Sequence, residues 1–360
     1  MGTPRQAHPW LCFLLLGATT VAFGQNAVMR PNVDDHTNDY RVTVLVSDEE
    51  DEAPLVDPLL VNAWGIAASD TSPWWVANNG TGTSTVYTGD GTKIPGLEPS
   101  VPGQPTGTVF NTSSTFQMAD GVPAKFIFAS LDGKFSAWNG DVNPNAVVVH
   151  DEPGSVYIAL AIHGDTLYSP NFATCEIEAF RGNFFDDSFA EVDLPGGFED
   201  KSVPTGYCPF GIQAIGDSIF VAYAKVGPDG DEEHGVGLGA VREFDTDGNF
   251  VSKIADHGPF NAPWGMAKAP ADWGRFSGCL IVGNFGDGTI TGWCEKRREK
   301  KWRFAGYLRD KGPKIFIDGL WGIGFGNGHN SGPQNVLYFA AGPDGETHGY
   351  YGKVEFHPEE

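Results

Sequence analysis

The chain has 360 residues and a formal net charge of −23, from 46 acidic against 23 basic residues. A charge of this sign repels a phosphate backbone, so we exclude nucleic acid as a partner. The 48 glycines and 25 prolines separate short apolar runs and form no polar tract, so the composition favours short strands joined by turns over disorder.

The first 24 residues have the features of a secretory signal peptide. Arg5 precedes an apolar run from Trp10 to Ala18, and Ala22-Phe23-Gly24 forms a cleavage site. The apolar run is short for a bilayer-spanning anchor, although an uncleaved N-terminal anchor is the alternative. We expect residues 25–39 to be a flexible segment. The mature chain is then exported to the extracellular space or the periplasm, without a transmembrane anchor.

A short pattern recurs along the rest of the chain and marks six repeats. Each copy has a small or apolar marker residue within one apolar strand, and a second apolar run follows after a gap. The markers lie 43 to 57 residues apart, at Gly65, Phe116, Ala159, Gly211, Gly265 and Gly322. A repeat of this length, made of short strands, is typical of one four-stranded propeller blade.

The strands within the repeats predict how the ring closes. The fifth repeat supplies four strands, over 264–268, 279–282, 289–294 and 304–309, and the fourth does so over 210–214, 219–223, 240–244 and 251–254. The sixth repeat supplies three and ends at 353–356, so we expect the strand at 41–46 to complete it. The predicted fold class is therefore all-β, a single six-bladed β-propeller over 40–357 closed by an N-terminal strand.

Three stretches of the chain carry a resemblance to a known family. They are Asn62 to Ala67 with Ser72 to Gly82, Ala262 to Gly265 with Val282 to Gly288, and Asp318 to Gly322. These stretches resemble a family of exported, mostly bacterial six-bladed propeller proteins with no assigned function. The resemblance implies export and the six-bladed fold, and it implies no substrate. The chain departs from the family pattern at Cys175, at Cys208 and in the basic run Lys296 to Lys301.

Four of the five cysteines remain after cleavage, because Cys12 lies in the signal peptide. Cys279 and Cys294 flank a predicted hairpin whose register places them opposite each other, so we predict a disulfide between them. The pairing of Cys175 with Cys208 stays open. The basic run that follows Cys294 is interpreted as a solvated hairpin tip, with a docking site for an acidic partner as the alternative.

Candidate site residues come from two sets of loops. In a propeller, the loops before the inner strands and the loops between the second and third strands lie on one face. The first set offers Asn62, Asn261 and Asp318, and the second offers Asn79, Asn171, Asn284 and Asp287. Two longer, similar loops at 227–235 and 342–349 add Asp229, His234, Asp344 and His348.

These residues allow two interpretations. Asn62, Asn261 and Asp318 have the oxygen ligands of a Ca²⁺ site at the channel mouth, which would polarise an ester or lactone carbonyl. Alternatively, Asn and Asp beside glycine build tight turns. His234 and His348 recur beside carboxylates and are candidates for ligand binding or general-base duty, with plain solvation as the alternative. Trp74, Trp75, Trp273 and Trp302 could contribute a sugar-stacking surface, although core packing is more usual.

No catalytic or cofactor-binding motif occurs in a suitable context. We therefore rank a binding module first, as a monomer that holds a small molecule, a carbohydrate or a protein on its channel face. A Ca²⁺-dependent hydrolase of the lactonase or esterase type is the alternative. A quinone-linked oxidoreductase ranks third, because these loops are poor in Lys and Arg.

Overall fold

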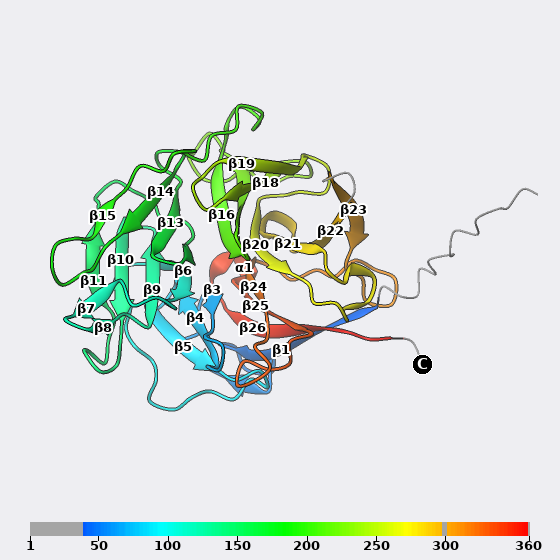
Figure 1. The fold of residues 1–360 in the computed structure, drawn as a ribbon. Helices are drawn as coiled ribbons and strands as arrows, with labels where there is room; N and C mark the ends of the chain where they lie inside the picture. The colour runs from blue at the N-terminus through cyan, green and yellow to red at the C-terminus, as the bar shows by residue number, and fades with distance from the viewer. Residues whose placement is uncertain (1–38, 297–300, 359–360) are drawn as a thin grey trace, which may run out of the picture. The chain divides into compact units, whose positions relative to one another are not determined.

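The computed structural model describes residues 39–296 and 301–358, which belong to one compact unit. They form six β-sheets arranged as the blades of a ring (Figure 1). This arrangement confirms the predicted six-bladed β-propeller. The predicted signal peptide, the segment 25–38 and residues 297–300 of the basic run lie outside the described residues. No helix within the described ranges is long and apolar enough to cross a membrane.

The strands of each blade are antiparallel, and they are named below in order from the channel outward. Blade 1 contains β3 (Ala63–Ala67), β4 (Trp74–Asn78) and β5 (Thr83–Tyr87). Blade 2 contains β6 (Pro105–Phe110), β9 (Phe126–Ser130), β10 (Lys134–Trp138) and β11 (Val147–Asp151). Blade 3 contains β12 (Ala161–His163), β13 (Thr166–Asn171), β14 (Glu176–Arg181) and β15 (Ala190–Glu191). A small hairpin of β7 (Gln117–Ala119) and β8 (Val122–Pro123) projects from blade 2.

The second half of the ring follows the same plan. Blade 4 contains β16 (Tyr207–Ile215), β17 (Ser218–Lys225), β18 (Gly239–Asp245) and β19 (Phe250–Asp256). Blade 5 contains β20 (Pro263–Lys268), β21 (Leu280–Asn284), β22 (Ile290–Lys296) and β23 (Lys301–Tyr307). Blade 6 contains β24 (Leu320–Phe325), β25 (Val336–Ala341), β26 (Tyr350–Phe356) and β1 (Tyr40–Ser47). The edge strand β2 (Leu55–Val56) pairs with β1. Three short helical turns lie at Gly274–Phe276, at Phe285–Asp287 and in α1 (Pro343–Glu346).

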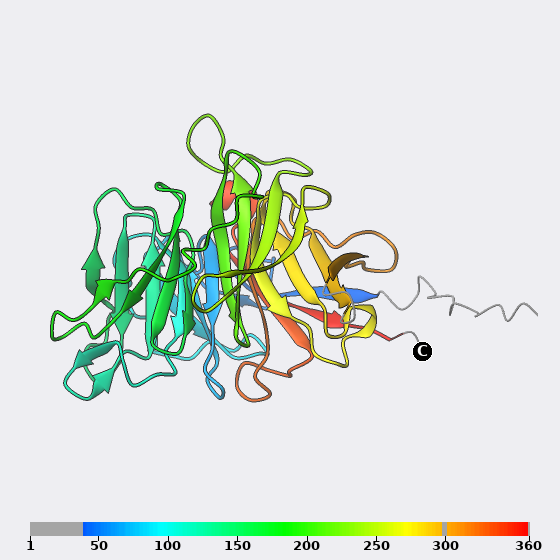
Figure 2. The same ribbon diagram turned by 45° about the horizontal axis from the view of Figure 1, so that its top comes forward.

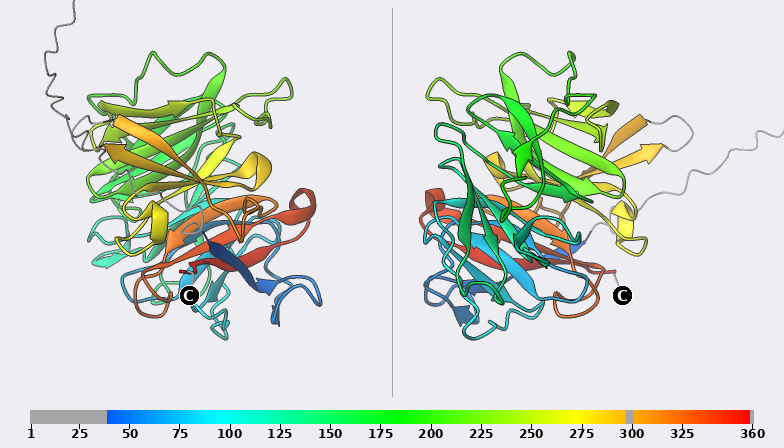
Figure 3. Two further views of the ribbon diagram at one scale, coloured as in Figure 1. Left: turned by 90° about the vertical axis from the view of Figure 1, so that its right-hand side faces the viewer. Right: turned by 60° about the vertical axis from the view of Figure 1, so that its left-hand side comes forward.

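A strand from the N-terminus closes the ring, as predicted. β1 pairs antiparallel with β26 from Tyr40 opposite Phe356 to Ser47 opposite Tyr350, and Figure 3 shows the two strands side by side. The ring of Tyr40 is fully buried and packs against Trp273 of blade 5, and its hydroxyl donates a hydrogen bond to the Trp273 carbonyl oxygen. β1 therefore completes blade 6 and fastens it to blade 5, so β26 is not an open edge.

The first two blades correct two details of the sequence analysis. Blade 1 has three strands, and an irregular segment covers its outer edge through backbone hydrogen bonds from Ser84 to Pro99 and from Ile94 to Val86. In blade 2 the inner strand is β6 with Gly107, and Phe116 lies outside it with a φ of 58°. The second repeat marker is therefore Gly107. The sequence Pro105-Thr106-Gly107 matches Pro263-Trp264-Gly265, which the apolar pattern alone obscured because Thr106 replaces an aromatic residue.

The marker glycines are explained by the close approach of neighbouring inner strands. A Cβ atom on Gly265 would meet the carbonyl oxygen of Trp321, and one on Gly322 would lie 2.6 Å from the carbonyl oxygen of Trp64. A Cβ atom on Gly107 would meet the backbone nitrogen of Leu160. Only glycine leaves room for backbones this close, so the repeated glycine sets the width of the channel.

Both pairs of cysteines form disulfides. Cys279 and Cys294 are joined, with Leu280 opposite Trp293 in the register that predicted the bond. Cys175 and Cys208 are also joined, which the sequence left open. Their bond links the loop after β13 in blade 3 to β16 in blade 4. One disulfide thus lies within a blade and the other between two blades.

Candidate functional site

The two loop sets singled out in the sequence meet within each blade. In blade 1 the amide of Asn79 donates to the carbonyl oxygen of Asn62, and in blade 5 the amide of Gly286 donates to that of Asn261. In blade 6 the corresponding bond runs from Gly342 to Gly319. We call the face that carries these loops the upper face and the opposite one the lower face. Figure 2 shows α1 and the loop between β17 and β18 together at the upper face.

The side chains of the candidate asparagines hold this face together. Asn62 Oδ1 accepts a hydrogen bond from Trp64 Nε1, and its Nδ2 donates to Asn79 Oδ1. Asn261 Oδ1 accepts from the amide of Gly235, and Asn284 Oδ1 accepts from the amide of Asn261. Asn171 Oδ1 accepts from the amide of Val156. These bonds support the interpretation of the amides as builders of turns.

The three residues of the predicted Ca²⁺ site are each engaged elsewhere. Asp318 Oδ2 accepts from the amide of Asp344, while the oxygens of Asn62 and Asn261 accept from Trp64 and Gly235. Among the described residues no hydrogen bond joins any two of the three. Asp287 Oδ1 accepts from the amide and hydroxyl of Thr289 within its own turn. Their oxygens therefore serve separate loops.

An aromatic layer lies beneath the loops at the channel axis. Trp64 and Trp321, from blades 1 and 6, stack with their ring centroids 3.6 Å apart, and Trp264 of blade 5 meets both edge-on. Trp264 Nε1 donates across the ring to the carbonyl oxygen of Ile158 in blade 3. Phe285 stacks on Trp321 at 3.7 Å. These indoles therefore pack blades against one another and also cover the channel at its upper end.

A polar cluster lies against this layer and joins two blades that are not neighbours. Glu232 and His234 come from the loop between β17 and β18, and Glu346 comes from α1, which Figure 1 shows near the middle of the ring. His234 Nε2 lies 3.3 Å from Glu232 Oε1, and its ring meets Phe285 edge-on at 5.2 Å. The charges of Glu232 and His234 act on Glu346, which lies beside Trp321. We call these five residues the upper-face cluster.

The electrostatics of the cluster follow from this packing. The hydrogen bond with Glu232 raises the pKa of His234 above its ordinary value, against the opposing effect of burial. Burial raises the pKa of Glu346, and the negative charge of Glu232 adds to the rise, while hydrogen-bonding contacts from the side chains of Asn62 and Trp321 oppose it. Glu346 therefore takes up a proton more readily than an exposed glutamate does.

Two polar atoms of the cluster are buried without a hydrogen bond. The indole of Trp321 lies close enough to the carboxyl of Glu346 to lower the pKa of that group. Even so, within the described residues neither Trp321 Nε1 nor Glu346 Oε1 has a partner at full hydrogen-bond geometry. Trp321 is only 1% exposed, whereas His234, on the other side of Phe285, is exposed. A buried indole N–H or carboxyl oxygen without a partner costs free energy, and the large majority of such groups in proteins have one.

The backbone that carries Glu346 is also unusual. Asp344, Gly345 and Glu346 have φ angles of 53°, 64° and 68°, so three successive residues are left-handed. This conformation costs about 1–2 kcal/mol for each residue that is not glycine. The hydrogen bond from the amide of Asp344 to Asp318 and that from the amide of Glu346 to Gly342 hold the turn in place. Strained backbone of this kind concentrates at binding and catalytic sites.

The two similar loops place their histidines differently. His234 belongs to the upper-face cluster. His348 turns toward the closing strand, with its Nδ1 3.0 Å from Asp48 Oδ2 and its Nε2 3.4 Å from Glu49 Oε1. The hydrogen bond with Asp48 is the main cause that raises the pKa of His348. Glu49, Asp344 and His348 are close enough to share an ion, but they lie at the rim of blade 6.

Other sequence candidates are either exposed or buried away from this cluster. Asp229 is exposed at the tip of its loop. Trp74, Trp75 and Trp273 are buried in the core and Trp302 is half-buried, so these four residues do not form the sugar-stacking surface that their number suggested. Glu232, Glu346 and the indole N–H of Trp321 were not predicted from the sequence. A glutamate near the same place in both long loops was the available signal.

The lower end of the channel holds a different kind of space. A cavity of about 350 Å³ lies there, and residues from the inner strands or following loops of all six blades line it, among them Ile66, Val109, Ile162, Ile215, Met266 and Phe325. Most of its lining residues are apolar, and Asp70, Gln213 and Lys268 add polar groups to the walls. The candidate residues of the upper face do not contribute to it.

Comparison with known proteins connects the chain with two viral sequences. No family model matches the chain. A protein of Acanthamoeba polyphaga mimivirus, "Uncharacterized protein R648", is 29% identical over 331 residues, which cover 88% of this chain and 80% of that protein. "Uncharacterized protein L690" of the same virus is 30% identical over 335 residues, which cover 88% of this chain and 85% of that protein.

Solved structures resemble the chain more distantly. Virginiamycin B lyase from Staphylococcus aureus has 14% sequence identity and a TM-score of 0.49, over 89% of this chain and 100% of that one. A chain of a nidogen/laminin complex has 10% identity and a TM-score of 0.43, over 78% and 84%. Neither likeness carries a conclusion about activity. The identity and coverage shared with L690 decide the relationship: the chain belongs to the same family as this mimivirus protein.

Proposed function

We propose that this protein is an exported binding module that holds a hydroxyl-rich ligand of the carbohydrate class on its upper face. The observation that carries the proposal is the buried pair Trp321 Nε1 and Glu346 Oε1: the indole lies close to the carboxyl, but neither atom has a partner at full hydrogen-bond geometry. They lie at the channel mouth, beside the exposed ring of His234. A ligand group that accepts from the indole and donates to the carboxylate would satisfy both atoms.

The chemistry of the cluster favours hydroxyl groups over charged ligands. The indole N–H of Trp321 and the His234 ring donate hydrogen bonds, whereas the carboxylates of Glu232 and Glu346 accept them. An anion would meet the two carboxylates, and a cation would leave the indole donor without a partner. Each hydroxyl of a sugar both donates and accepts, so a sugar matches this mixed set. The exposed ring of His234 offers a neighbouring aromatic surface on which a sugar ring can stack.

Two features support export. The first 24 residues have the features of a signal peptide. The two disulfides are typical of proteins from oxidising compartments. We therefore expect the ligand to be an extracellular or cell-envelope molecule. A projecting side chain of a protein partner is the alternative occupant of the same cluster.

The alternative function, Ca²⁺-dependent hydrolysis, would use Asn62, Asn261 and Asp318. No contact of the described residues brings these three side chains to one point, so we rank it second. Metal analysis of the purified protein tests it directly. One tightly held equivalent of Ca²⁺, with a melting temperature that rises on Ca²⁺ addition in the parent and not in Asp318→Asn, would reverse the ranking.

The binding proposal can be tested with a panel of soluble mono- and oligosaccharides, followed by saturation-transfer NMR. We expect at least one sugar to bind the parent protein, and His234→Ala to weaken that binding tenfold or more. His348→Ala is the matched control, because it alters the corresponding residue of the similar loop outside the cluster. Equal effects of the two variants, or no binding by any sugar of the panel, would contradict the proposal.

A further inference from the structure

A second cavity lies between blades 3 and 4, away from the upper-face cluster. It has a volume of about 400 Å³, and its walls come from the strands and loops of both blades. We call it the acidic groove, because five carboxylates line it and no Lys, Arg or His does: Glu176, Glu191, Asp193, Glu199 and Asp200. A volume of this size falls within the range of small-molecule sites, roughly 300–1,000 Å³.

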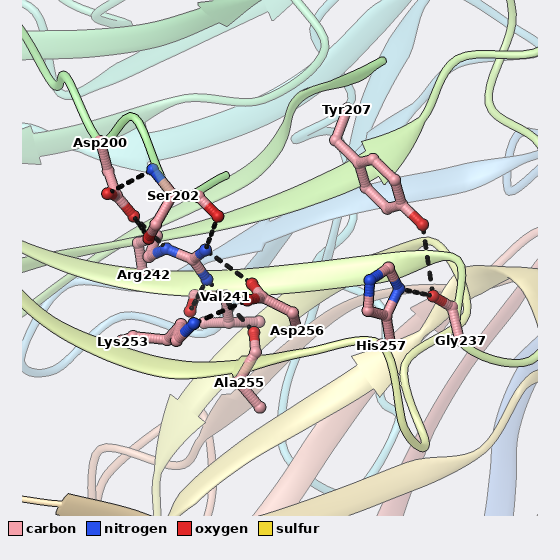
Figure 4. A network of polar contacts seen from close by, with 10 residues as sticks. All are labelled: Asp200, Ser202, Tyr207, Gly237, Val241, Arg242, Lys253, Ala255, Asp256 and His257. Carbon is pink, nitrogen blue, oxygen red and sulfur yellow. Dashed lines mark hydrogen bonds and ion pairs between the residues drawn. The ribbon is translucent and has the colours of Figure 1, made fainter. Parts of the chain in front are cut away.

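One of the five carboxylates is already neutralised. Arg242 is fully buried behind the groove, where its Nε donates to Asp200 Oδ2 and its Nη2 lies 2.6 Å from Asp256 Oδ1 (Figure 4). Burial raises the pKa of Asp200, but hydrogen bonds from Arg242 and Ser202 outweigh it and leave the pKa below its ordinary value. Asp200 is therefore a fixed, charged part of the wall.

The other four carboxylates have no cationic partner among the described residues. Glu176, Glu191, Asp193 and Glu199 form no ion pair in residues 39–296 and 301–358. Burial raises the pKa of Glu191, and repulsion from Glu178, Asp193 and Glu176 raises it further. Carboxylates that repel one another in this way would gain from a bound cation.

An independent feature points into the groove. Tyr223 of β17 lines it and is only 4% exposed, and no hydrogen bond of its hydroxyl is found within the described residues. The charges of Asp200 and Arg242 both act on this hydroxyl, so it lies near them. Burial raises the pKa of Tyr223, so the hydroxyl stays protonated and neutral. A hydroxyl that lines the groove without a protein partner, on a side chain this deeply buried, is a group with which a ligand in the groove would form a hydrogen bond.

The groove is rigid and partly apolar. The disulfide from Cys175 to Cys208 ties its blade 3 wall to its blade 4 wall. Ile177, Val192 and Leu194 line it between the carboxylates. Apolar side chains between negative groups suit methylene segments between positive groups.

We infer that the acidic groove binds an aliphatic oligoamine, a small molecule in which methylene chains separate two or more ammonium groups. The ammonium groups face Glu176, Glu191, Asp193 and Glu199, and the methylene chain packs on the apolar wall. One amine N–H donates to the oxygen of Tyr223. A basic peptide segment is a separate partner, and the test below distinguishes it.

The test uses spermidine as the probe and the mature protein, followed by isothermal titration calorimetry at fixed ionic strength. We expect saturable binding of spermidine and none of 1,8-octanediol, which has a similar apolar length without charge. Glu191→Gln/Asp193→Asn should weaken binding tenfold or more. Both residues are exposed, so the fold should be unaffected. Glu50→Gln/Asp51→Asn, which removes two acids at the rim of blade 6, is the matched control and should change binding less than twofold.

A second variant separates the built site from general attraction to an acidic protein. Tyr223→Phe removes only the buried hydroxyl and should weaken spermidine binding about threefold to tenfold, the usual effect of losing one hydrogen bond. Equal weakening by the two double variants would overturn the inference, as would binding of a lysine-rich peptide with no binding of spermidine. Sugar binding at the upper face shares none of these residues, so the two proposals fail separately.

Discussion

Trp64 and Trp321 stack face to face, 3.6 Å between ring centroids, although they come from the first and last blades of the ring. The next residue after Trp321 is Gly322, whose α-carbon approaches the carbonyl oxygen of Trp64 too closely for a Cβ atom to fit without a shift. The sequence pair Trp321-Gly322 therefore has two structural roles. Its indole covers the channel, and its glycine lets neighbouring inner strands approach.

The closing strand predicts a strong effect of truncation. Deleting residues 39–46 removes most of β1 with the buried ring of Tyr40 and exposes the edge of β26. We expect aggregated or strongly destabilised protein, because an unpaired edge strand is a template for pairing between chains. Size-exclusion chromatography and thermal melting measure both effects. A deletion variant that stays monomeric with unchanged melting would show that the ring does not depend on β1.

The corrected repeat marker predicts a position-specific cost. Gly107→Ala places a methyl group against the backbone of Leu160, so we expect a loss of about 1–3 kcal/mol in the free energy of unfolding, typical of overpacking. Gly265→Ala should cost a similar amount, because its methyl group would meet the backbone of Trp321. Urea denaturation measures both. A neutral Gly107→Ala would contradict the assignment of Gly107 to the inner strand.

The hairpin disulfide predicts a modest contribution to stability. Replacing both Cys279 and Cys294 by alanine should lower the free energy of unfolding by no more than about 3 kcal/mol, since the bond closes a short loop. Non-reducing peptide mapping should also recover Cys279 joined to Cys294 and Cys175 joined to Cys208. Free thiols at these positions in oxidised, exported material would refute the pairing.

The buried arginine predicts a dependence of stability on pH. The pKa values of Asp200 and Asp256 lie below their ordinary value because hydrogen bonds and ion pairs with Arg242 and other neighbours outweigh burial. Their contribution is therefore present above the unfolded-state value near pH 4 and lost as the pH falls through the folded-state values. Urea denaturation should show stability decreasing below pH 4.

The matching variant is Arg242→Met. It leaves two carboxylates without their buried partner, so we expect a loss of about 3–5 kcal/mol at pH 7. The loss should shrink on acidification, because protonation relieves the two unpaired charges. An equal cost at pH 7 and pH 3 would show that the arginine contributes by packing alone.

The repeat pattern was sufficient to predict the ring, because each blade repeats the same local pattern of short strands, turns and a small residue where neighbouring backbones approach. It failed at Phe116, where a threonine in place of an aromatic residue hid the true inner strand. The hairpin register located the Cys279–Cys294 bond. No comparable register relates Cys175 to Cys208, which lie in different blades, so only the three-dimensional arrangement of the ring brings them together.

The candidate site was harder to predict than the ring. The sequence identified the loops that meet at the upper face, but not the side chains within them that remain available. Asparagines dominate these loops, and the structure shows that their amides are engaged in holding turns. Glu346 approaches Glu232 from another blade 114 positions along the chain. No local pattern reports a contact of that kind.

The most direct test of the central claim is the indole N–H resonance of Trp321, followed by two-dimensional NMR during titration with a sugar that binds in the saturation-transfer panel. Trp321→Phe, which keeps an aromatic ring and removes the N–H, assigns the signal among those of the other tryptophans. We predict that this resonance shifts in a saturable way. The resonance of Trp273, which is buried in the loop between β20 and β21, should stay in place. A sugar that binds while the Trp321 signal does not move would contradict binding at the upper-face cluster.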